Sequence, residues 1–147
     1  MGGSEGKSFA RLRVSTRKKL EELMEDVLEG FIGLDEDTKD IVLGPLYSKC
    51  NIGAADKILI GLLGYKAMYM VGWRDSDAVS AKELSEKLRI NYSTVRVNIS
   101  RLAERKYVIR RGRGVYSVNV SFLDEIAKRL IKVKRKCLEE GGADSYV

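Results

Sequence analysis

The stretch from residue 80 to residue 106, SAKELSEKLRINYSTVRVNISRLAERK, decides the fold. Ser80 and Glu83 form a capping box, in which the hydroxyl and the carboxylate satisfy each other's free backbone amides. We therefore expect a helix to begin at Ala81 and to stop near Arg89. Its buried face carries three apolar residues, namely Ala81, Leu84 and Leu88.

A second helix is expected from residue 92 to residue 106, after a turn that contains Ile90 and with Asn91 as its N-cap. On a helical wheel the inward side carries Val95, Ile99, Leu102 and the stem of Lys106. The outward side carries Ser93, Arg96, Val97, Ser100 and Arg101, with Thr94 and Glu104 near its edges. Such a face suits phosphates and base edges, and Val97 suits a thymine methyl. The alternative is an ordinary soluble helix.

A two-stranded hairpin follows the second helix. The β-branched run at 107–109 predicts one strand, and the alternation at 115–118 predicts the returning strand. The glycine-containing turn between them, 110–114, places three arginines at the tip: Arg110, Arg111 and Arg113. Because like charges repel one another, this cluster favours a bound anion over a purely structural hairpin.

Positive charge is concentrated in the same part of the chain. Residues 78–119 contain ten basic and three acidic side chains, whereas the whole chain has a net charge of only +6. Such a concentration is typical of a surface that binds a polyanion, because each neutralised phosphate releases counterions. A solvated face that keeps the protein soluble is the alternative.

Residues 81–96, AKELSEKLRINYSTVR, resemble the winged helix-turn-helix pattern A-x-x-L-x-x-x-L-x-[IV]-x-x-[ST]-T-V of MarR-type and related archaeal and bacterial transcription regulators. Leu102 and the residues after it resemble the family's exit into the wing, L-x-x-x-G-[LIV], with Tyr107 in place of the usual glycine. The resemblance covers about half of the chain. It implies that the second helix enters the major groove of duplex DNA and that the wing lies along the backbone.

The resemblance thus implies a DNA-binding protein that regulates transcription. The residues expected to contact DNA are Ser93, Thr94, Arg96, Val97, Ser100, Arg101, Arg110, Arg111 and Arg113. Two alternatives stay open. One is a winged-helix protein that binds RNA or the ribosome, and the other is a protein-interaction module in a nucleic-acid-processing assembly.

We expect a mainly α fold with a small β-hairpin wing, of the α+β class, in which helices flank the winged helix-turn-helix domain. The expected divisions are a flexible N-terminal tip at 1–14, a helical extension at 15–50, the domain at 54–119, a C-terminal helix at 120–138 and a flexible tail at 139–147.

Within the extension, residues 15–31 predict an amphipathic helix. Asp35 is expected to cap a shorter helix that carries Ile41, Val42 and Leu43, with the neighbouring acidic residues at its N-terminus. The apolar segment 54–72 predicts the central helix, whose Gly61 and Gly64 allow another helix to approach closely. This helix carries an aromatic stripe, which we interpret as part of the core and not as the lining of an effector pocket. The stripe consists of Tyr65, Tyr69 and Trp73.

The C-terminal helix is expected to present an apolar seam formed by Leu123, Ile126, Leu130, Val133 and Cys137. Together with the N-terminal helix, this seam either pairs two protomers as a homodimer or packs within one chain. The outer face of the helix is expected to carry six cations: Lys128, Arg129, Lys132, Lys134, Arg135 and Lys136.

The composition excludes several classes of protein. With 44% hydrophobic and 33% charged residues the chain is typical of a soluble globular protein. The absence of histidine removes the commonest general base and most zinc sites, so we expect no catalytic residue, no metal and no cofactor. The longest apolar stretch, 58–73, is shorter than a bilayer span, and no apolar signal core opens the chain. We expect a cytoplasmic location, with Cys50 and Cys137 as reduced structural thiols.

Overall fold

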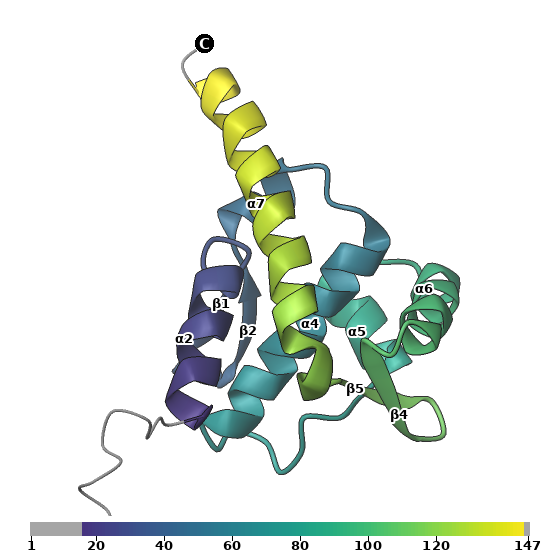
Figure 1. The fold of residues 1–147 in the computed structure, drawn as a ribbon. Helices are drawn as coiled ribbons and strands as arrows, with labels where there is room; N and C mark the ends of the chain where they lie inside the picture. The colour runs from purple at the N-terminus through teal and green to yellow at the C-terminus, as the bar shows by residue number, and fades with distance from the viewer. Residues whose placement is uncertain (1–15, 146–147) are drawn as a thin grey trace, which may run out of the picture.

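Helices make up most of the chain, and two small antiparallel sheets complete it (Figure 1). The structure, a computed structural model, describes residues 16–145, so the tip predicted at 1–14 lies outside the described residues. The helices are α2 (Thr16–Leu28), α3 (Pro45–Lys49), α4 (Ala54–Met70), α5 (Ala81–Leu88), α6 (Tyr92–Glu104), the short 3-10 helix η1 (Val120–Phe122) and α7 (Leu123–Ser145). The strands are β1 (Ile32–Asp35), β2 (Asp40–Leu43), β3 (Val79–Ser80), β4 (Val108–Gly112) and β5 (Val115–Val118). This mixed, mainly α composition agrees with the predicted class.

Helix α4 is the centre of the core. It is apolar on nearly all sides, and α2, α5, α6, α7 and both sheets contact it. A Cβ atom on Gly61 would lie 2.8 Å from Cδ1 of Leu88 on α5, so the predicted close approach of a helix is confirmed there. At Gly64 the close neighbours are Ile32 and Ile41, each with Cδ1 2.7 Å from such a Cβ, and they belong to strands rather than to a helix.

The predicted hairpin after α6 is confirmed as part of a larger sheet. Its strands β4 and β5 pair antiparallel, with Val108 opposite Val118. The short strand β3 pairs with β5 so that Val79 lies opposite Tyr116. The strand order β3-β5-β4 joins the start of α5 to the hairpin.

The prediction of a second helix in the N-terminal extension is wrong, because β1 and β2 form a β-hairpin there. Their register runs from Ile32 opposite Leu43 to Asp35 opposite Asp40. Burial alternates along β2, where Ile41 is 4% exposed and Val42 46%. The Asp35 carboxylate accepts a hydrogen bond of 2.9 Å from the Asp37 N–H, which stabilises the connecting turn. The acidic residues therefore build a turn instead of a helix N-terminus.

Cys50 and Cys137 form a disulfide, which corrects the prediction of two reduced thiols. The two residues are 87 positions apart in sequence, and their Cα atoms lie 5.6 Å apart. They meet because α3, which ends just before Cys50, packs against α7. The cross-link thus ties the C-terminal helix to the N-terminal half of the chain, as the adjacent paths of the two segments in Figure 1 illustrate.

Helix α7 differs from its prediction in length. It extends to Ser145, so most of the tail predicted at 139–147 is helical, and residues 146–147 lie outside the described residues. Glycine weakens a helix interior by about 1 kcal/mol relative to alanine without forbidding it. The pair Gly141 and Gly142 therefore does not end the helix. No helix within residues 16–145 is both long enough and apolar enough to cross a membrane.

The apolar seam of α7 packs within the chain, which was the second of the two alternatives. Leu123, Ile126, Leu130 and Cys137 are buried, and α7 contacts α2, α3 and α4. Two of the six cations expected on the outer face turn inward instead. Arg129 pairs with Asp56, and the Lys134 ammonium donates to the Asp26 carbonyl oxygen at 2.5 Å.

Candidate nucleic-acid interface

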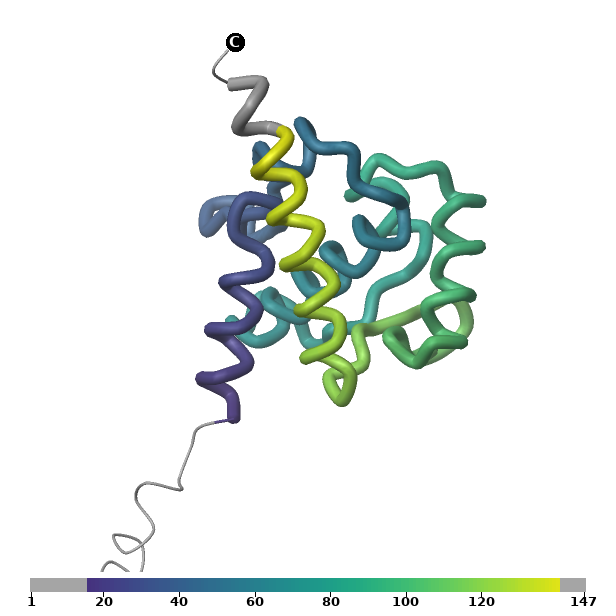
Figure 2. The backbone as a smooth tube through the Cα atoms, turned by 45° about the horizontal axis from the view of Figure 1, so that its top comes forward, coloured from purple at the N-terminus to yellow at the C-terminus, as the bar shows by residue number. Residues whose placement is uncertain are grey.

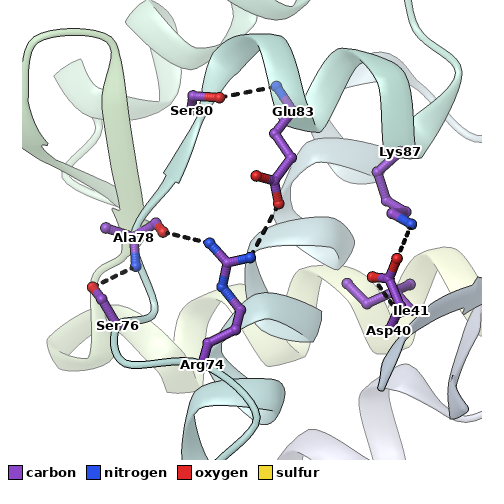
Figure 3. A network of polar contacts seen from close by, with 8 residues as sticks. All are labelled: Asp40, Ile41, Arg74, Ser76, Ala78, Ser80, Glu83 and Lys87. Atoms are coloured by element: carbon purple, nitrogen blue, oxygen red, sulfur yellow. Dashed lines mark hydrogen bonds and ion pairs between the residues drawn. The ribbon is translucent and has the colours of Figure 1, made fainter. Parts of the chain in front are cut away.

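Helix α5 begins as the capping pattern predicts, but only half of the capping box forms. The Ser80 hydroxyl accepts a hydrogen bond of 3.0 Å from the Glu83 N–H (Figure 3). The Glu83 carboxylate turns to Arg74 and accepts a 3.2 Å hydrogen bond from its Nη1. The second Arg74 nitrogen, Nη2, donates to the Ala78 carbonyl oxygen at 3.3 Å. Arg74 therefore holds the loop before β3 against the first turn of α5.

A second ion pair fixes the other end of α5. Lys87 donates to the carboxylate of Asp40 on β2 (Figure 3). Partial burial opposes ionisation of Asp40, but hydrogen bonds from Lys87 and the Ile41 N–H, with the charges of Lys87 and Arg74, outweigh it and lower the pKa of Asp40. The carboxylate is therefore a stable anchor for α5 near neutral pH.

The turn between α5 and α6 is held from several sides. The buried Tyr47 hydroxyl donates to the Leu88 carbonyl oxygen at 2.5 Å, and burial raises the pKa of Tyr47 to about 12. The Ser85 hydroxyl donates to the Ile90 carbonyl oxygen at 2.6 Å. Asn91 caps α6 as predicted, because its side-chain oxygen accepts a 2.9 Å hydrogen bond from the Ser93 N–H. These bonds fix the direction in which α6 leaves α5.

The two faces of α6 lie as the wheel predicts. Val95, Ile99 and Leu102 are buried in the core. The opposite face is an open depression, lined by Ser93, Arg96, Val97, Ser100, Arg101 and Glu104. Five of the six residues predicted on this helix are thus brought together. The exception is Thr94, which is half-buried and does not line the depression.

Sequence reasoning missed Tyr92 as part of this surface. Its side chain is 48% exposed, and the Arg96 guanidinium lies 5.8 Å from the centroid of its ring. A cation at this distance is attracted to the face of the ring. The signal was an aromatic residue in the first turn of a helix whose apolar side is already complete without it.

The end of α6 corrects two predictions about its exit. The residue with a left-handed conformation is Lys106, with φ of 67°, and not Tyr107. The Lys106 N–H donates to the Ala103 carbonyl oxygen and the Tyr107 N–H to that of Leu102, each at 3.0 Å, which is the Schellman pattern. Lys106 therefore occupies the position that favours glycine, and its stem does not continue the buried side of the helix.

The hairpin carries its arginines along one strand as well as at the tip. Arg110 and Arg111 lie in β4, so the turn is shorter than the predicted 110–114, and Arg113 lies in it with Gly114, whose φ is 71°. Arg111 Nε donates to the buried Ser117 hydroxyl at 2.8 Å, and Arg110 Nε donates to the Gly112 carbonyl oxygen at 3.3 Å. All three arginines are exposed, but only Arg113 is at the tip.

The cations of this region have no carboxylate partner among the described residues. The ion pairs of residues 16–140 are Arg17–Glu21, Lys66–Asp77, Arg74–Glu83, Lys87–Asp40 and Arg129–Asp56. None of them includes the eight cations of what we call the basic face, namely Arg89, Arg96, Arg101, Arg105, Lys106, Arg110, Arg111 and Arg113. All eight are exposed.

The elements that carry these cations are neighbours. Helix α6 contacts both α5 and β4. Both views place α6 and the β4–β5 hairpin on the side of the molecule away from α2 (Figures 1 and 2). The geometry therefore gathers unpaired positive charge around one helix and one hairpin. No protein-family model, curated protein or solved structure matches this chain.

Proposed function

We propose that this chain is a winged helix-turn-helix protein that binds duplex DNA and regulates transcription. In this proposal α6 is the recognition helix and the β4–β5 hairpin is the wing. The order α4, β3, α5, α6, β4, β5 supports this topology, as does the strand order β3-β5-β4. Recognition helices of this kind lie in the major groove, and their N-terminal residues contact base edges.

The observation that carries the proposal is the lack of carboxylate partners on the basic face. Eight exposed cations lie on neighbouring elements, and no ion pair within residues 16–140 includes any of them. Their mutual repulsion opposes folding unless an anion offsets it. A duplex offsets it well, because it presents regularly spaced phosphates and releases counterions on binding.

Different residues are assigned different tasks. Arg96 and Arg101 flank exposed Val97 and Ser100 in the depression of α6, so they suit base edges together with nearby phosphates. The ring of Tyr92 restricts the Arg96 guanidinium before DNA arrives, which lowers the entropy lost on binding. Arg113 in the tip of the hairpin suits the backbone, where contacts carry no sequence information.

Glu104 limits the part of α6 that can approach a DNA backbone. It lines the same depression as the arginines, and no ion pair in the described part of the chain includes it. A carboxylate repels phosphate, so the backbone should pass nearer to the N-terminal half of α6 than to its last turn. Replacing Glu104 with glutamine is therefore expected to strengthen binding to all duplexes alike.

Selection of bound fragments from a random duplex pool at two salt concentrations tests the proposal. We expect a recurring sequence motif and an affinity that falls steeply with salt. A palindromic motif would add that two copies bind together. Competition with structured RNA tests the RNA-binding alternative. If the chain is an RNA-binding protein, the RNA should displace the duplex from it. No retention of duplex at low salt would reject the proposal in favour of a protein-interaction module.

A further inference from the structure

An open groove of about 590 Å³ lies on the side of the molecule away from the basic face, between α2, β1 and the C-terminal end of α4. Apolar side chains from all three elements line it, among them Met24 and Leu28 from α2, Leu34 from β1 and Met70 from α4. An apolar hollow of this size exposes surface that a bound segment would remove from water.

A row of charged residues on α2 borders this groove. Arg17, Glu21, Glu25 and Glu29 follow one another at four-residue spacing, which places them on one face of the helix. Arg17 closes one end, because it pairs with Glu21 and its Nη2 donates to the Met70 carbonyl oxygen at 2.5 Å. The Glu29 carboxylate faces the positive charge of Lys134. Glu25, between them, has no partner among residues 16–140.

The charge of this row of residues determines which kind of molecule can bind in the groove. Three glutamates against Arg17 and the neighbouring Lys134 leave the border net negative, so it repels a nucleic-acid backbone and the groove is not an extension of the basic face. An occupant needs apolar side chains for the floor and cations for the border. That combination is a basic and apolar peptide segment.

We propose that the occupant is the chain's own N-terminal segment, residues 7–15, KSFARLRVS. Its three cations, Lys7, Arg11 and Arg13, match the acidic border. Its apolar residues match the floor, and they are Phe9, Ala10, Leu12 and Val14. The segment joins α2 at Thr16, immediately before Arg17 at the end of the groove.

The tether allows this docking. Nine extended residues reach about 30 Å, and a helix with the length of α2 spans about 20 Å. A segment that folds back at Thr16 therefore reaches the whole border. Attachment to the same chain also gives the segment an effective concentration in the millimolar range, so individually weak contacts suffice. Docking holds three cations against the glutamates and leaves the basic face to its own partner.

Limited trypsin digestion of the full chain tests this proposal, because trypsin cleaves after Lys7, Arg11 and Arg13. A segment that is docked nine-tenths of the time is cleaved about tenfold more slowly than a free one. We therefore expect Glu25→Lys to accelerate cleavage after Arg13 about tenfold, as followed by mass spectrometry. Glu22→Lys is the matched control, because Glu22 is exposed on α2 but does not line the groove.

Two further variants keep the test decisive if Glu25→Lys disturbs the fold. Phe9→Ala changes only the segment and should also release it. Adding Arg11→Glu to Glu25→Lys exchanges the two charges and should restore slow cleavage after Arg13. Equal cleavage rates in all variants and the wild type would overturn the proposal. Protection that rises with protein concentration would also overturn it, because the groove would then bind the segment of a second copy.

Discussion

Cations are used differently in two regions of the molecule. In the layer formed by α2, the β1–β2 hairpin, α3 and α7, Arg17 pairs with Glu21 and Arg129 pairs with Asp56 of α4. The exposed cations on the outer side of α7 form no ion pair within residues 16–140, and they are Lys128, Lys132, Arg135 and Lys136. On the basic face around α6 and the β4–β5 hairpin, no exposed cation pairs with a carboxylate of the described chain. The comparison teaches that the residue type alone does not assign a role. A paired cation contributes to the fold, whereas an unpaired one is available to a partner.

The two regions should therefore respond separately to mutation. Changes in the α2–α7 layer are expected to alter the free energy of unfolding and to leave binding intact. Changes on the basic face are expected to do the reverse.

The largest expected effect is loss of the Cys50–Cys137 disulfide. A cross-link over 87 residues restricts the unfolded chain, and in the chain-entropy model its removal costs about 4.6 kcal/mol. Replacing both cysteines with alanine should lower the free energy of unfolding by that amount and shift the denaturant midpoint downward, and a thiol reductant should do the same to the wild type. Duplex affinity of the folded protein should not change. A reductant that leaves the wild-type midpoint unchanged would contradict this expectation.

The next effect concerns the basic face. Arg96→Ala or Arg101→Ala should weaken binding to a selected duplex by about 1–3 kcal/mol and relax its sequence preference. Arg113→Ala should weaken selected and random duplexes alike. Fluorescence anisotropy with both duplexes measures this difference. Arg129→Ala on α7 is the control, because it should lose stability and keep its affinity. Equal losses on both duplexes for all three basic-face variants would argue against the assigned tasks.

A smaller effect is expected at the junction of the two regions, where α3 meets the end of α5. Tyr47→Phe leaves the Leu88 carbonyl oxygen without its donor, at a cost of about 1 kcal/mol. Because burial raises the pKa of Tyr47 to about 12 from 10.0, its contribution is complete below pH 10 and is lost as pH rises toward 12. Urea midpoints of both proteins from pH 8 to pH 12 should therefore converge. A constant difference across this range would disagree.

The smallest effect is expected from the ion pair that joins β2 to α5. Asp40→Asn should cost less than about 1 kcal/mol at pH 7, because the Asp40 side chain is 41% exposed and solvent screens the pair. Since the pKa of Asp40 is lowered from 3.8, the contribution is present above pH 3.8 and disappears as the pH falls below it. Thermal midpoints of the two proteins should differ at pH 7 and coincide in strong acid. A difference that persists in acid would assign the loss to another contact.

The sequence predicted the α5–α6 region well because its signals are local. The caps at Ser80 and Asn91 act over two or three residues, and the apolar period of α6 repeats along its own helix. Most of the candidate site follows from the same periodicity, apart from half-buried Thr94 and the exposed ring of Tyr92. The winged-helix topology and the contacts with DNA remain proposals.

The failures occurred where a local pattern suits two structures. A run of three apolar residues such as Ile41-Val42-Leu43 fits a short helix as well as a strand, and only its pairing with β1 made it a strand. At the end of α6 the error was one of register, because the pattern L-x-x-x-G counted from Leu102 reaches Lys106, whereas the glycine-like position was assigned to Tyr107. The backbone shows it at Lys106, where two hydrogen bonds to the last turn require a left-handed residue.

By itself, the sequence determined which segments are helical around the turn, which side of each helix is apolar and where positive charge is concentrated, because these properties depend on neighbours within about four residues. Only the tertiary structure decided which charges are paired and which cysteines are joined. Arg129 meets Asp56 and Cys50 meets Cys137 because packing of the helices brings together residues far apart in the chain. Such long-range contacts depend on the packing of the whole core, and no local spacing in the sequence encodes them.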